Sequence, residues 1–550
     1  MFLTRYSAIR RAVDGFRHIA KLASSSGRRS IRELQAKRDK VDGMLAELAR
    51  ASSGRFDGEI LIDAQYDNPN YWLRVSLLRA ALGLSYGKET GLLGEFRKKE
   101  CSRTMGILGI GKQHEYLAIK VDRRAIRSLS QELVSSARSA DDILKWKLPE
   151  NVPAVMIYDG ILKRQRLATI DVRRRDFPKL VEEGLLGIAR AKRLLDEHEF
   201  KLVVISHPVH FTYGPIAWQA LQRGIPVVLP FGLFGMIRMT HMQRPEDLFT
   251  FYDRPTREEM DTLPGKRALA LAAIGKQYLA GRFGGKADDL ASVYAYQRRV
   301  EAISRAEICR RFGWDPAKPI VGFYAANWYD WPHQLGMSQF RDFLDWTEAT
   351  FDTARTNTDV NWLFKPHPCE EWFGGISLTS ILDQYGHPRH IAVADAHWNN
   401  AAVMRSIDAL ITYHGTAGVE FASLGKPVLV PDKGKYDDCG FVKVARDRAD
   451  YLRLLKTEWW HDMDLKDCQR RAEIFAGWWF CAPEWQGQFI LADDPRGNAH
   501  YDIIPGLLSE NASVVTRETE HLKAWYHSGH AYSHTCKMMQ ADAFMLTNVS

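Results

Sequence analysis

The chain has 550 residues, of which 45% are hydrophobic and 26% charged, and this length exceeds what one hydrophobic core ordinarily organises, so we expect at least two globular domains. The formal net charge of +8 is modest for this size; it suits a protein that handles anionic ligands and does not indicate a nucleic-acid-binding protein. The seven cysteines are scattered and include no CxxC pair, which argues against a disulfide framework or a zinc site and favours a reducing compartment.

Residues 1–54 are expected to form a basic helical extension. Apolar side chains recur there every three or four positions between arginines, as on one face of a helix: Phe2, Tyr6, Ile9, Val13, Phe16 and Ile19. Such a stripe suits a helix that packs on its own protein or on a partner subunit, and a helix on a membrane surface is the alternative. The stretch lacks the apolar core of a secretory signal and no apolar run reaches the length of a membrane span, so we expect a cytoplasmic location, with peripheral contact to the inner membrane as the variant.

From about residue 55 onward, strand-like runs alternate with helical patterns. Strands are expected at 58–66, 152–160, 200–207 and 225–230. Helices are expected at 177–199 and 214–224. Strand, helix and strand joined by short links are typical of a parallel sheet with crossover helices, so this region predicts a first α/β domain.

A second alternating series follows a largely helical stretch. Its expected strands are 318–326, 359–368, 390–395, 409–415 and 426–431. Its expected helices are 339–356, 399–408 and 417–425, and a closing helix is expected within 517–539. Open parallel sheets bind ligands at the carboxyl ends of their strands, so two successive sheets predict a shared central cleft in which two substrates can be joined.

The stretch FKPHP at 364–368 places a lysine and a histidine directly after an expected strand. Each following proline favours an extended conformation, so Lys365 and His367 point to the same side with little freedom to lose. A lysine beside a histidine at the carboxyl edge of a sheet suits a phosphate. A loop whose histidine merely packs is the alternative, and the next motif favours the phosphate interpretation.

The stretch YHGTAGVEFASLGKP at 413–427 carries small residues between a strand and a helix. Gly415, Thr416 and Gly418 allow a close approach of the backbone, and the free N–H groups of a helix start form an anion site beside His414. Glu420 lies within the first turns, where it reaches ribose hydroxyls or is an ordinary acid favoured by the helix dipole.

The catalytic candidates lie in the first domain. Asp159 and His207 are expected just past strand ends, where either is placed to act as a general base; a turn-forming Asp159 and a buried hydrogen-bonding His207 are equally compatible with the pattern. Weaker candidates are Asp63, Gln65 and Asp67, at the end of the expected strand 58–66.

A further loop follows the first strand of the second domain. AANWYDWPHQLG at 325–336 presents Asn327, Asp330 and His333 toward the cleft, unless it is a plain loop. By contrast, GILGIGKQ at 106–113 has the glycine and lysine spacing of a P-loop but Gln113 where a Ser or Thr must hold magnesium, and no clear strand precedes it, so we discount it.

These residues resemble bacterial capsule and surface-polysaccharide glycosyltransferases of the two-Rossmann GT-B type. The resemblance is carried by FKPHP, by YHGTAGVEFASLGKPVLV with KYDDCGF downstream, and by AANWYDWPH; it is specific across about 320–445 and weaker across 150–260. It implies that Lys365 and His367 contact the phosphate of a nucleotide-sugar donor. It further implies that Gly415 and Thr416 cradle that phosphate and that Glu420 holds the ribose. Related transferases of CMP-linked keto-sugars such as Kdo carry a similar His-Pro pair, which points to a CMP donor.

The predicted architecture is therefore an α/β GT-B fold in which two Rossmann-like domains face a cleft. The predicted parts are a helical extension (1–54), an acceptor domain (55–295), a donor domain (296–515) and a C-terminal helix that packs back on the first domain (516–550). The donor-site candidates are Lys365, His367, His414, Gly415, Thr416, Gly418, Glu420, Asn327, Asp330 and His333.

The predicted activity is transfer of a sugar from a nucleotide-sugar donor to a surface-polysaccharide or glycolipid acceptor. It needs a base on the acceptor hydroxyl, Asp159 or His207, and cationic side chains for the departing phosphate. With no DxD at a strand end we expect neither a metal nor a cofactor. The alternatives are a CDP-polyol phosphotransferase of the teichoic-acid type, a nucleotide-sugar 2-epimerase, and a non-catalytic scaffold of a polysaccharide assembly complex.

Overall fold

The computed structural model describes residues 25–50, 56–65, 67–83, 88–94, 97–230, 237–250, 254–286, 295–296, 301–334, 336–367, 370, 376–481, 500–510 and 512–535. The apolar stripe expected within the first nineteen residues lies outside these ranges, so its role stays a prediction.

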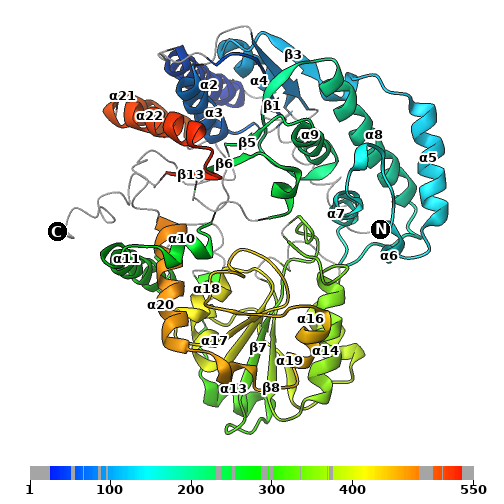
Figure 1. Ribbon diagram of the computed structural model, residues 1–550, viewed down its shortest axis with the longest axis vertical. Coiled ribbons are helices and arrows are strands. Elements are labelled where there is room, and N and C mark those ends of the chain that lie inside the picture. The colour runs from blue at the N-terminus through cyan, green and yellow to red at the C-terminus, as the bar shows by residue number, and fades with distance from the viewer. Residues whose placement is uncertain are drawn as a thin grey trace.

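Two separate β-sheets organise the molecule (Figure 1). The first has seven strands in the order β13-β6-β5-β4-β1-β2-β3. Its strands are β1 (Glu59–Ala64), β2 (Glu89–Leu93), β3 (Lys112–Glu115), β4 (Phe200–Val204), β5 (Val227–Leu229), β6 (Ile237–Met242) and β13 (Tyr532–Thr535). Strands β1 to β5 pair in parallel, while β6 and β13 are antiparallel additions at one edge.

The second sheet has six strands, all parallel, in the order β12-β11-β10-β7-β8-β9. Its strands are β7 (Ile320–Tyr324), β8 (Asn361–Lys365), β9 (Ile391–Val393), β10 (Ala409–Thr412), β11 (Val428–Val430) and β12 (Lys443–Val444). Most are short buried runs of apolar residues, as expected of parallel strands covered on both faces. We call each sheet with the helices packed on it a unit. The prediction of an α/β GT-B fold with two parallel sheets is confirmed.

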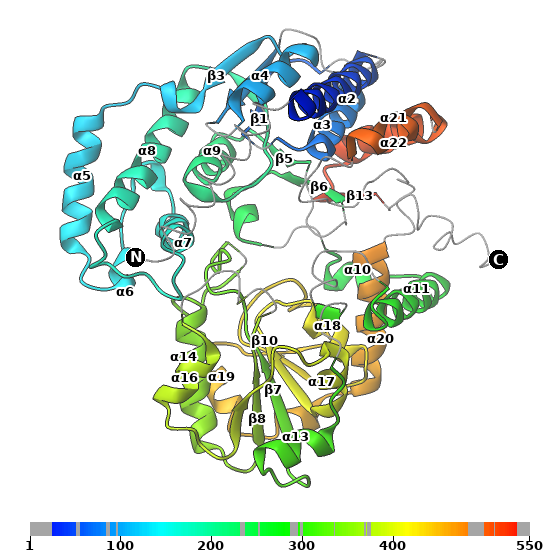
Figure 2. The ribbon, with the colours of Figure 1, turned by 180° about the vertical axis from the view of Figure 1, so that it is seen from behind.

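Helices cover both faces of each sheet (Figure 2). Those of the first unit are α3 (Pro69–Leu82), α4 (Lys98–Ile107), α5 (Arg123–Ser136), α6 (Ala140–Ile143), α7 (Ala154–Gln165), α8 (Phe177–Asp196) and α9 (His210–Gln222). Those of the second unit are α13 (Arg305–Phe312), α14 (Phe343–Thr356), α16 (Leu378–Gln384), α17 (Asn400–Ser406), α18 (Ala417–Ala422), α19 (Arg448–Leu454) and α20 (Leu465–Ala476).

Local sequence sets the ends of these helices. In α3 the side chain of Asn68 accepts a hydrogen bond from the Asn70 N–H, and Pro69 occupies the first helical position, where its missing N–H costs nothing. Gly83 ends the helix in the left-handed conformation. Packing then stabilises the helix, because burying one Leu or Val side chain contributes about 1.5–3 kcal/mol.

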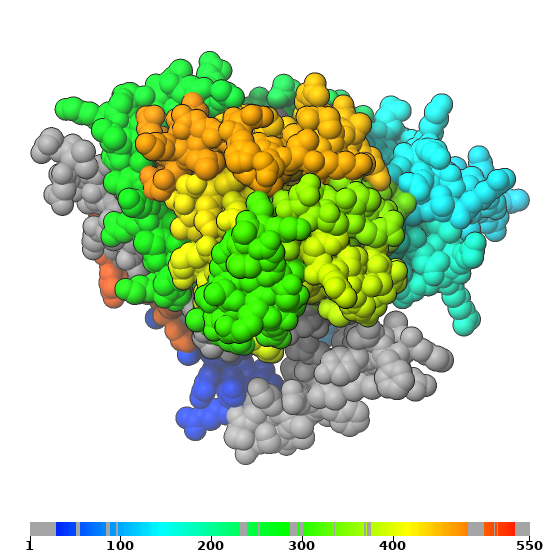
Figure 3. Space-filling view, turned by 90° about the horizontal axis from the view of Figure 1, so that it is seen from below, coloured from blue at the N-terminus to red at the C-terminus, as the bar shows by residue number. Residues whose placement is uncertain are grey.

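Two helical segments between the sheets in sequence are α10 (Arg257–Asp261) and α11 (Gly265–Phe283). Helix α11, which the predicted boundaries assign to the acceptor domain, packs mainly against α20 of the second unit (Figure 1). The two helices approach closely at Gly275, where an added Cβ would lie 1.9 Å from the Glu473 carbonyl oxygen. Seen from below, the green-to-orange second unit fills the centre of the view, and cyan segments of the first unit project at one side (Figure 3).

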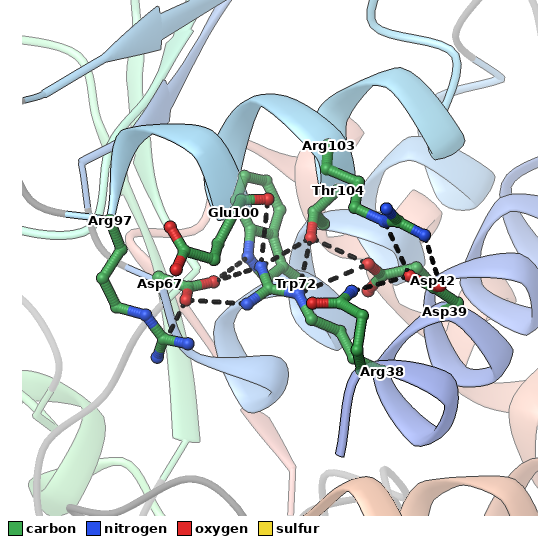
Figure 4. A network of polar contacts seen from close by, with 10 residues as sticks. Arg38, Asp39, Asp42, Asp67, Trp72, Arg97, Glu100, Arg103 and Thr104 are labelled. Atoms are coloured by element: carbon green, nitrogen blue, oxygen red, sulfur yellow. Dashed lines mark hydrogen bonds and ion pairs between the residues drawn. The ribbon is translucent and has the colours of Figure 1, made fainter. Parts of the chain in front are cut away.

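The described part of the N-terminal extension is helix α2 (Ser25–Arg50), which packs on the first unit against α3, α4 and α21 (His500–Glu510). Arg38 is buried at the centre of this contact and pairs with Asp67 at 2.7 Å and with the Thr104 hydroxyl at 2.7 Å (Figure 4). Burial also raises the pKa of Asp42 to about 6. The extension is thus held by a buried polar network as well as by apolar residues.

The C-terminal segment also joins the first unit. Helix α22 (Ala512–Ser528) packs against α3, and β13 pairs with β6. The helix expected within 517–539 therefore ends at Ser528, and a strand follows it, because Gly529 turns the chain in the left-handed conformation.

The strand expected at 152–160 is wrong. These residues start helix α7, which begins after Pro153 and buries apolar side chains around most of its circumference. A short apolar run does not distinguish a buried strand from a buried helix, and here the helix is formed. The discounted P-loop at 106–113 joins the end of α4 to β3, the reverse of the strand-to-helix order that a P-loop requires.

Candidate active site at the junction of the two sheets

Both sheets have a topological switch point, where the chain leaves neighbouring strands toward opposite sides. In the first sheet this point lies between β1 and β4, and in the second between β7 and β10. Ligands of open α/β sheets bind in the crevice beyond the carboxyl ends of such strands. The two crevices adjoin, since Gln334, which follows β7, donates from Nε2 to the carbonyl oxygen of Pro208, which follows β4, at 3.1 Å.

The carboxyl edge of the second sheet carries the predicted phosphate residues. Thr412, Tyr324 and Lys365 lie in register across β10, β7 and β8. Lys365 is only 2% exposed, and its Nζ lies 5.7 Å from the centroid of the Tyr324 ring. His367 and His414 each come two residues after this row, just beyond the carboxyl ends of β8 and β10.

His367 and His414 are brought close together with Lys435. Burial, and after it the positive charges of Lys435 and His367, together lower the pKa of His414 to about 3. The two histidines and the lysine thus share one region in which an additional positive charge is unfavourable. An anion placed there would relieve this repulsion, which is the electrostatic character of a phosphate site.

The small-residue loop at 415–418 is shaped by a tyrosine. The Tyr436 hydroxyl donates to the Gly415 carbonyl oxygen at 2.6 Å, and a Cβ at Gly418 would lie 2.1 Å from the same hydroxyl oxygen. Gly418 is therefore required by packing against Tyr436. Thr416 occupies the N-cap position of α18 without a capping hydrogen bond from its side chain. Because α18 spans six residues, its dipole adds little to the field of the nearby cations.

Glu420 is 2% exposed, and both its carboxylate oxygens have protein partners. Arg282 of α11 donates from Nε to Oε1 at 2.5 Å, and the Tyr296 hydroxyl donates to Oε2. Asn400 in turn donates to the Tyr296 hydroxyl oxygen at 3.2 Å. The structure thus places Glu420 in a buried network between α18 and α11, and the ribose contact stays a prediction.

The loop after β7 is held by helix α7 of the first unit. The fully buried Asp159 carboxylate accepts hydrogen bonds from the backbone N–H of His333 (3.1 Å) and Gln334 (3.2 Å) and lies 2.7 Å from His333 Nδ1. Asp330 pairs with Lys163 at 3.2 Å, and the Asn327 carbonyl oxygen accepts from the Asp330 N–H. Asp159 therefore lies in mid-helix rather than past a strand end, and its described contacts hold this loop.

The carboxyl edge of the first sheet carries a chain of three polar side chains. The Ser206 hydroxyl donates to Asp63 Oδ2 at 2.6 Å, and His207 Nδ1 lies 3.0 Å from the same hydroxyl oxygen. The Asp63 carboxylate also accepts from the backbone N–H of Gln65 at 2.8 Å and of Ser206 at 3.3 Å. Burial raises the pKa of Asp63 to about 6 and lowers that of His207 to about 4.

A cavity of about 420 Å³ lies beside this chain in the first unit, and it is lined by Gln65, Gly94, Gly160, Arg164, His210, Phe211, Thr212 and Tyr213. His210 begins α9 with a φ of 73°, which is uncommon for a residue other than glycine. Its ring meets that of Trp331 from the second unit edge-on, with centroids 4.3 Å apart. Burial, and after it the charges of His207, Lys163 and Arg164, lower the pKa of His210 to about 3, so its ring is neutral near pH 7.

Three residues at this junction were not singled out from the sequence: Ser206, Tyr324 and Lys435. The sequence signal for Ser206 is its position directly before His207. Its hydrogen bond to Asp63 depends on the pairing of β1 with β4. Lys435 lies in the stretch KGKYDD beyond β11, and its place beside His414 depends on the fold. Asp67, one of the weaker candidates, belongs to the Arg38 network and not to this junction.

Within the described ranges, no cluster of three or more His, Cys, Asp or Glu side chains is arranged to hold a metal ion. Every helix in the part of the chain that the structure covers falls short of the length and apolar character needed to cross a membrane.

No known protein-family model matches this chain, and no curated protein matches it in sequence. Solved structures match it at low identity. A UDP-N-acetylglucosamine 2-epimerase is 12% identical, with 77% of this chain and 93% of the other covered and a TM-score of 0.23. The β-Kdo 2,4-transferase KpsC of Thermosulfurimonas dismutans is 14% identical, with 50% and 79% covered and a TM-score of 0.28. HepE of Anabaena in complex with UDP is 10% identical, with 84% and 100% covered and a TM-score of 0.24.

These likenesses are weak both in identity and in TM-score. The assignment of the fold therefore rests on the two parallel sheets and their strand orders.

Proposed function

We propose that the protein is a glycosyltransferase that moves a sugar from a nucleotide-sugar donor to the hydroxyl of a surface-polysaccharide or glycolipid acceptor. The observation that carries the proposal is the pairing of two unlike edges at one junction. A lysine and two histidines gather at the carboxyl edge of the second sheet, and a hydrogen-bonded histidine lies at the facing edge of the first.

The second edge supplies the donor site in this proposal. Departure of a nucleotide leaves negative charge on its phosphate, and fixed cationic groups in a buried site stabilise that charge strongly. Lys365, His367 and Lys435 have this character. The chain's own side chains therefore suffice for the charge, without a metal ion. A CMP-linked keto-sugar, which the sequence resemblance points to, is the first donor to test.

The first edge supplies the base. Burial lowers the pKa of His207 to about 4, so its imidazole is neutral near pH 7 and has a lone pair with which to take the acceptor proton. Asp159, the other predicted base, is engaged by His333 and Gln334, and we assign it the role of holding their loop. The adjoining cavity of about 420 Å³ gives the acceptor a place in the first unit.

The test is an activity assay with CMP-, UDP-, GDP- and CDP-linked donors, each with and without an oligosaccharide acceptor. The proposal expects transfer from one donor that requires acceptor, and its loss in His367→Ala. His461→Ala, at an exposed histidine of the second unit, is the matched control and should keep full turnover. Conversion of a UDP-sugar without acceptor would overturn the proposal in favour of epimerisation, and transfer of a polyol phosphate would overturn it in favour of a phosphotransferase.

A further inference from the structure

The chain of hydrogen bonds behind His207 has a chemical consequence for which of its two ring nitrogens carries the proton. An ionised carboxylate only accepts hydrogen bonds. The Ser206 hydroxyl therefore donates its proton in the 2.6 Å hydrogen bond to Asp63, and toward His207 the Ser206 oxygen can act only as an acceptor. At 3.0 Å from that oxygen, His207 Nδ1 must then be the protonated nitrogen. The lone pair of the neutral ring is left on Nε2.

We propose that Asp63 and Ser206 are positioning residues that fix the tautomer and the orientation of His207, so that Nε2 accepts the proton of the acceptor hydroxyl. This inference rests on the proposed role of His207 as the base. When Nε2 takes the proton, the ring becomes an imidazolium whose charge is balanced through Ser206 by the Asp63 carboxylate. No proton has to leave Asp63 or Ser206 in this step. The acceptor oxygen keeps the electron pair of its O–H bond and forms a bond to the sugar, while the bond between the sugar and the nucleotide phosphate breaks and the phosphate leaves with its electron pair.

The geometry favours a positioning role over mere packing. Asp63 lies at the end of β1 and Ser206 just after β4, the two strands that flank the switch point of the first sheet. Oδ1 is held by the Gln65 N–H and the Asp63 carbonyl by the Tyr71 hydroxyl at 2.9 Å, so the carboxylate has a fixed direction. A buried carboxylate held by such hydrogen bonds can orient an imidazole, much as the hydrogen-bonding partner on the second ring nitrogen orients a metal-binding histidine.

The hydrogen bonds from Asp63 through Ser206 to His207 also make the tautomer of His207 depend on pH. Once Asp63 is protonated, it donates to Ser206, the hydroxyl turns to donate to Nδ1, and the proton of the neutral ring moves to Nε2. Among the residues that the structure describes, Tyr71 of α3 and Cys101 of α4 interact electrostatically with Asp63, and burial raises the pKa of both, that of Cys101 to about 12. The pKa of His207 lies near 4 and that of the neighbouring His210 near 3, so Asp63, with a pKa of about 6, is the group of this described set that titrates between pH 5 and 8.

A direct test uses the protein labelled with ¹⁵N in its 18 histidines, because nitrogen chemical shifts separate the two tautomers without any substrate. The His207 signals are identified by their loss in His207→Ala. We expect the Nδ1–H form at pH 7.5 in the wild type, and the loss of this preference in Ser206→Ala. Ser206→Thr, which keeps the hydroxyl, should retain the preference. A wild-type His207 with its proton on Nε2 at pH 7.5 would overturn the proposal.

A kinetic test separates this inference from the proposed function. Ser206→Ala should lower kcat by about 10–100-fold with the donor KM unchanged, and Asp63→Asn should do likewise. In a His207→Ala background the same Ser206 change should cost nothing more, because it acts through His207. Ser135→Ala, at an exposed serine of α5, is the matched control.

The outcomes differ for the two claims. Full activity in His207→Ala would remove the base from the proposed function. Loss of activity in His207→Ala together with full activity in Ser206→Ala would overturn only the positioning role. An equal loss from Ser206→Ala in both backgrounds would also overturn it, because the serine would then act through the fold. If Asp63→Asn does not fold, Ser206→Ala measured in the wild-type and His207→Ala backgrounds still tests the positioning role.

Discussion

The two edges that meet at the junction differ in how they handle charge. The edge of the second sheet concentrates positive charge with Lys365, His367 and Lys435, whereas the edge of the first sheet buries one carboxylate, Asp63, behind a neutral histidine. The first arrangement suits binding of an anion, and the second suits movement of a proton. The proposed transferase reaction needs both, and in this proposal the fold divides the two tasks between its two units.

The largest effect is expected where the proton is moved. His207→Ala should lower kcat by about 10²–10⁴-fold, the usual contribution of a general base, while the affinity for the nucleotide donor stays unchanged. Steady-state kinetics with both substrates varied would measure this separation. A variant that loses donor affinity and keeps kcat would place His207 on the binding side of the comparison.

The next effect concerns the contact that joins the edges. Asp159→Ala leaves the buried backbone N–H groups of His333 and Gln334 without their acceptor, and each such loss costs about 1–3 kcal/mol. We expect the free energy of unfolding to fall by about 3 kcal/mol in chemical denaturation. Asp330→Ala, which breaks a partly exposed ion pair with Lys163, is the control and should cost less than about 1 kcal/mol. Equal losses from the two variants would contradict a special role for Asp159.

A smaller effect is expected at the cationic edge. Lys365→Met keeps the length of the buried side chain and removes its charge, so the affinity for the donor should fall about tenfold or more. The kcat should fall as well, because the departing phosphate loses a cation that stabilises its charge. Donor binding measured directly, without turnover, checks the change in affinity. Lys426→Met, whose lysine binds backbone carbonyls at the opposite end of the sheet, is the comparison variant and should leave the donor affinity unchanged.

The smallest effect is a dependence of stability on pH. The folded-state pKa of His414 lies near 3, below the ordinary value of 6.5, so its contribution to stability is complete above pH 6.5 and is lost as the pH falls toward 3. Wild-type stability should therefore fall between pH 6.5 and 4 more steeply than that of His414→Gln. His461→Gln, at an exposed histidine, should follow the wild type. Identical slopes for all three would show that His414 is not buried in its neutral form.

The same contrast explains what the sequence could predict. The edge of the second sheet, where we propose that the donor binds, is encoded in short stretches of sequence. FKPHP and YHGTAG each lie at the end of a strand of the same parallel sheet, and the structure brings His367 and His414 together. The alternation of strands and helices was likewise sufficient to predict two parallel sheets. Such local patterns predict structure because the period of the side chains along a strand or a helix is set by the backbone geometry of that element.

The edge of the first sheet depends instead on contacts between residues that are distant in sequence. Asp63 and Ser206 are 143 positions apart in sequence and meet only because β1 pairs with β4. Asp159 was placed past a strand because a short apolar run reads equally as a buried strand or a buried helix, and its partners at 333–334 lie in the other unit. The sequence resemblance assigns Glu420 to a ligand. Its buried partner Arg282 lies in α11, which the predicted boundaries place in the first domain but which packs on α20 of the second unit.

The central claim is that the edge formed by β7, β8 and β10 binds the phosphate of a nucleotide. Calorimetric titration of the wild-type protein with CMP, UDP, GDP and CDP tests it most directly, with His367→Ala and His461→Ala measured beside it. We expect one nucleotide to bind the wild type and the His461 control equally, and to bind His367→Ala at least tenfold more weakly. Undiminished binding to His367→Ala, or binding of none of the four nucleotides to the wild type, would contradict the account.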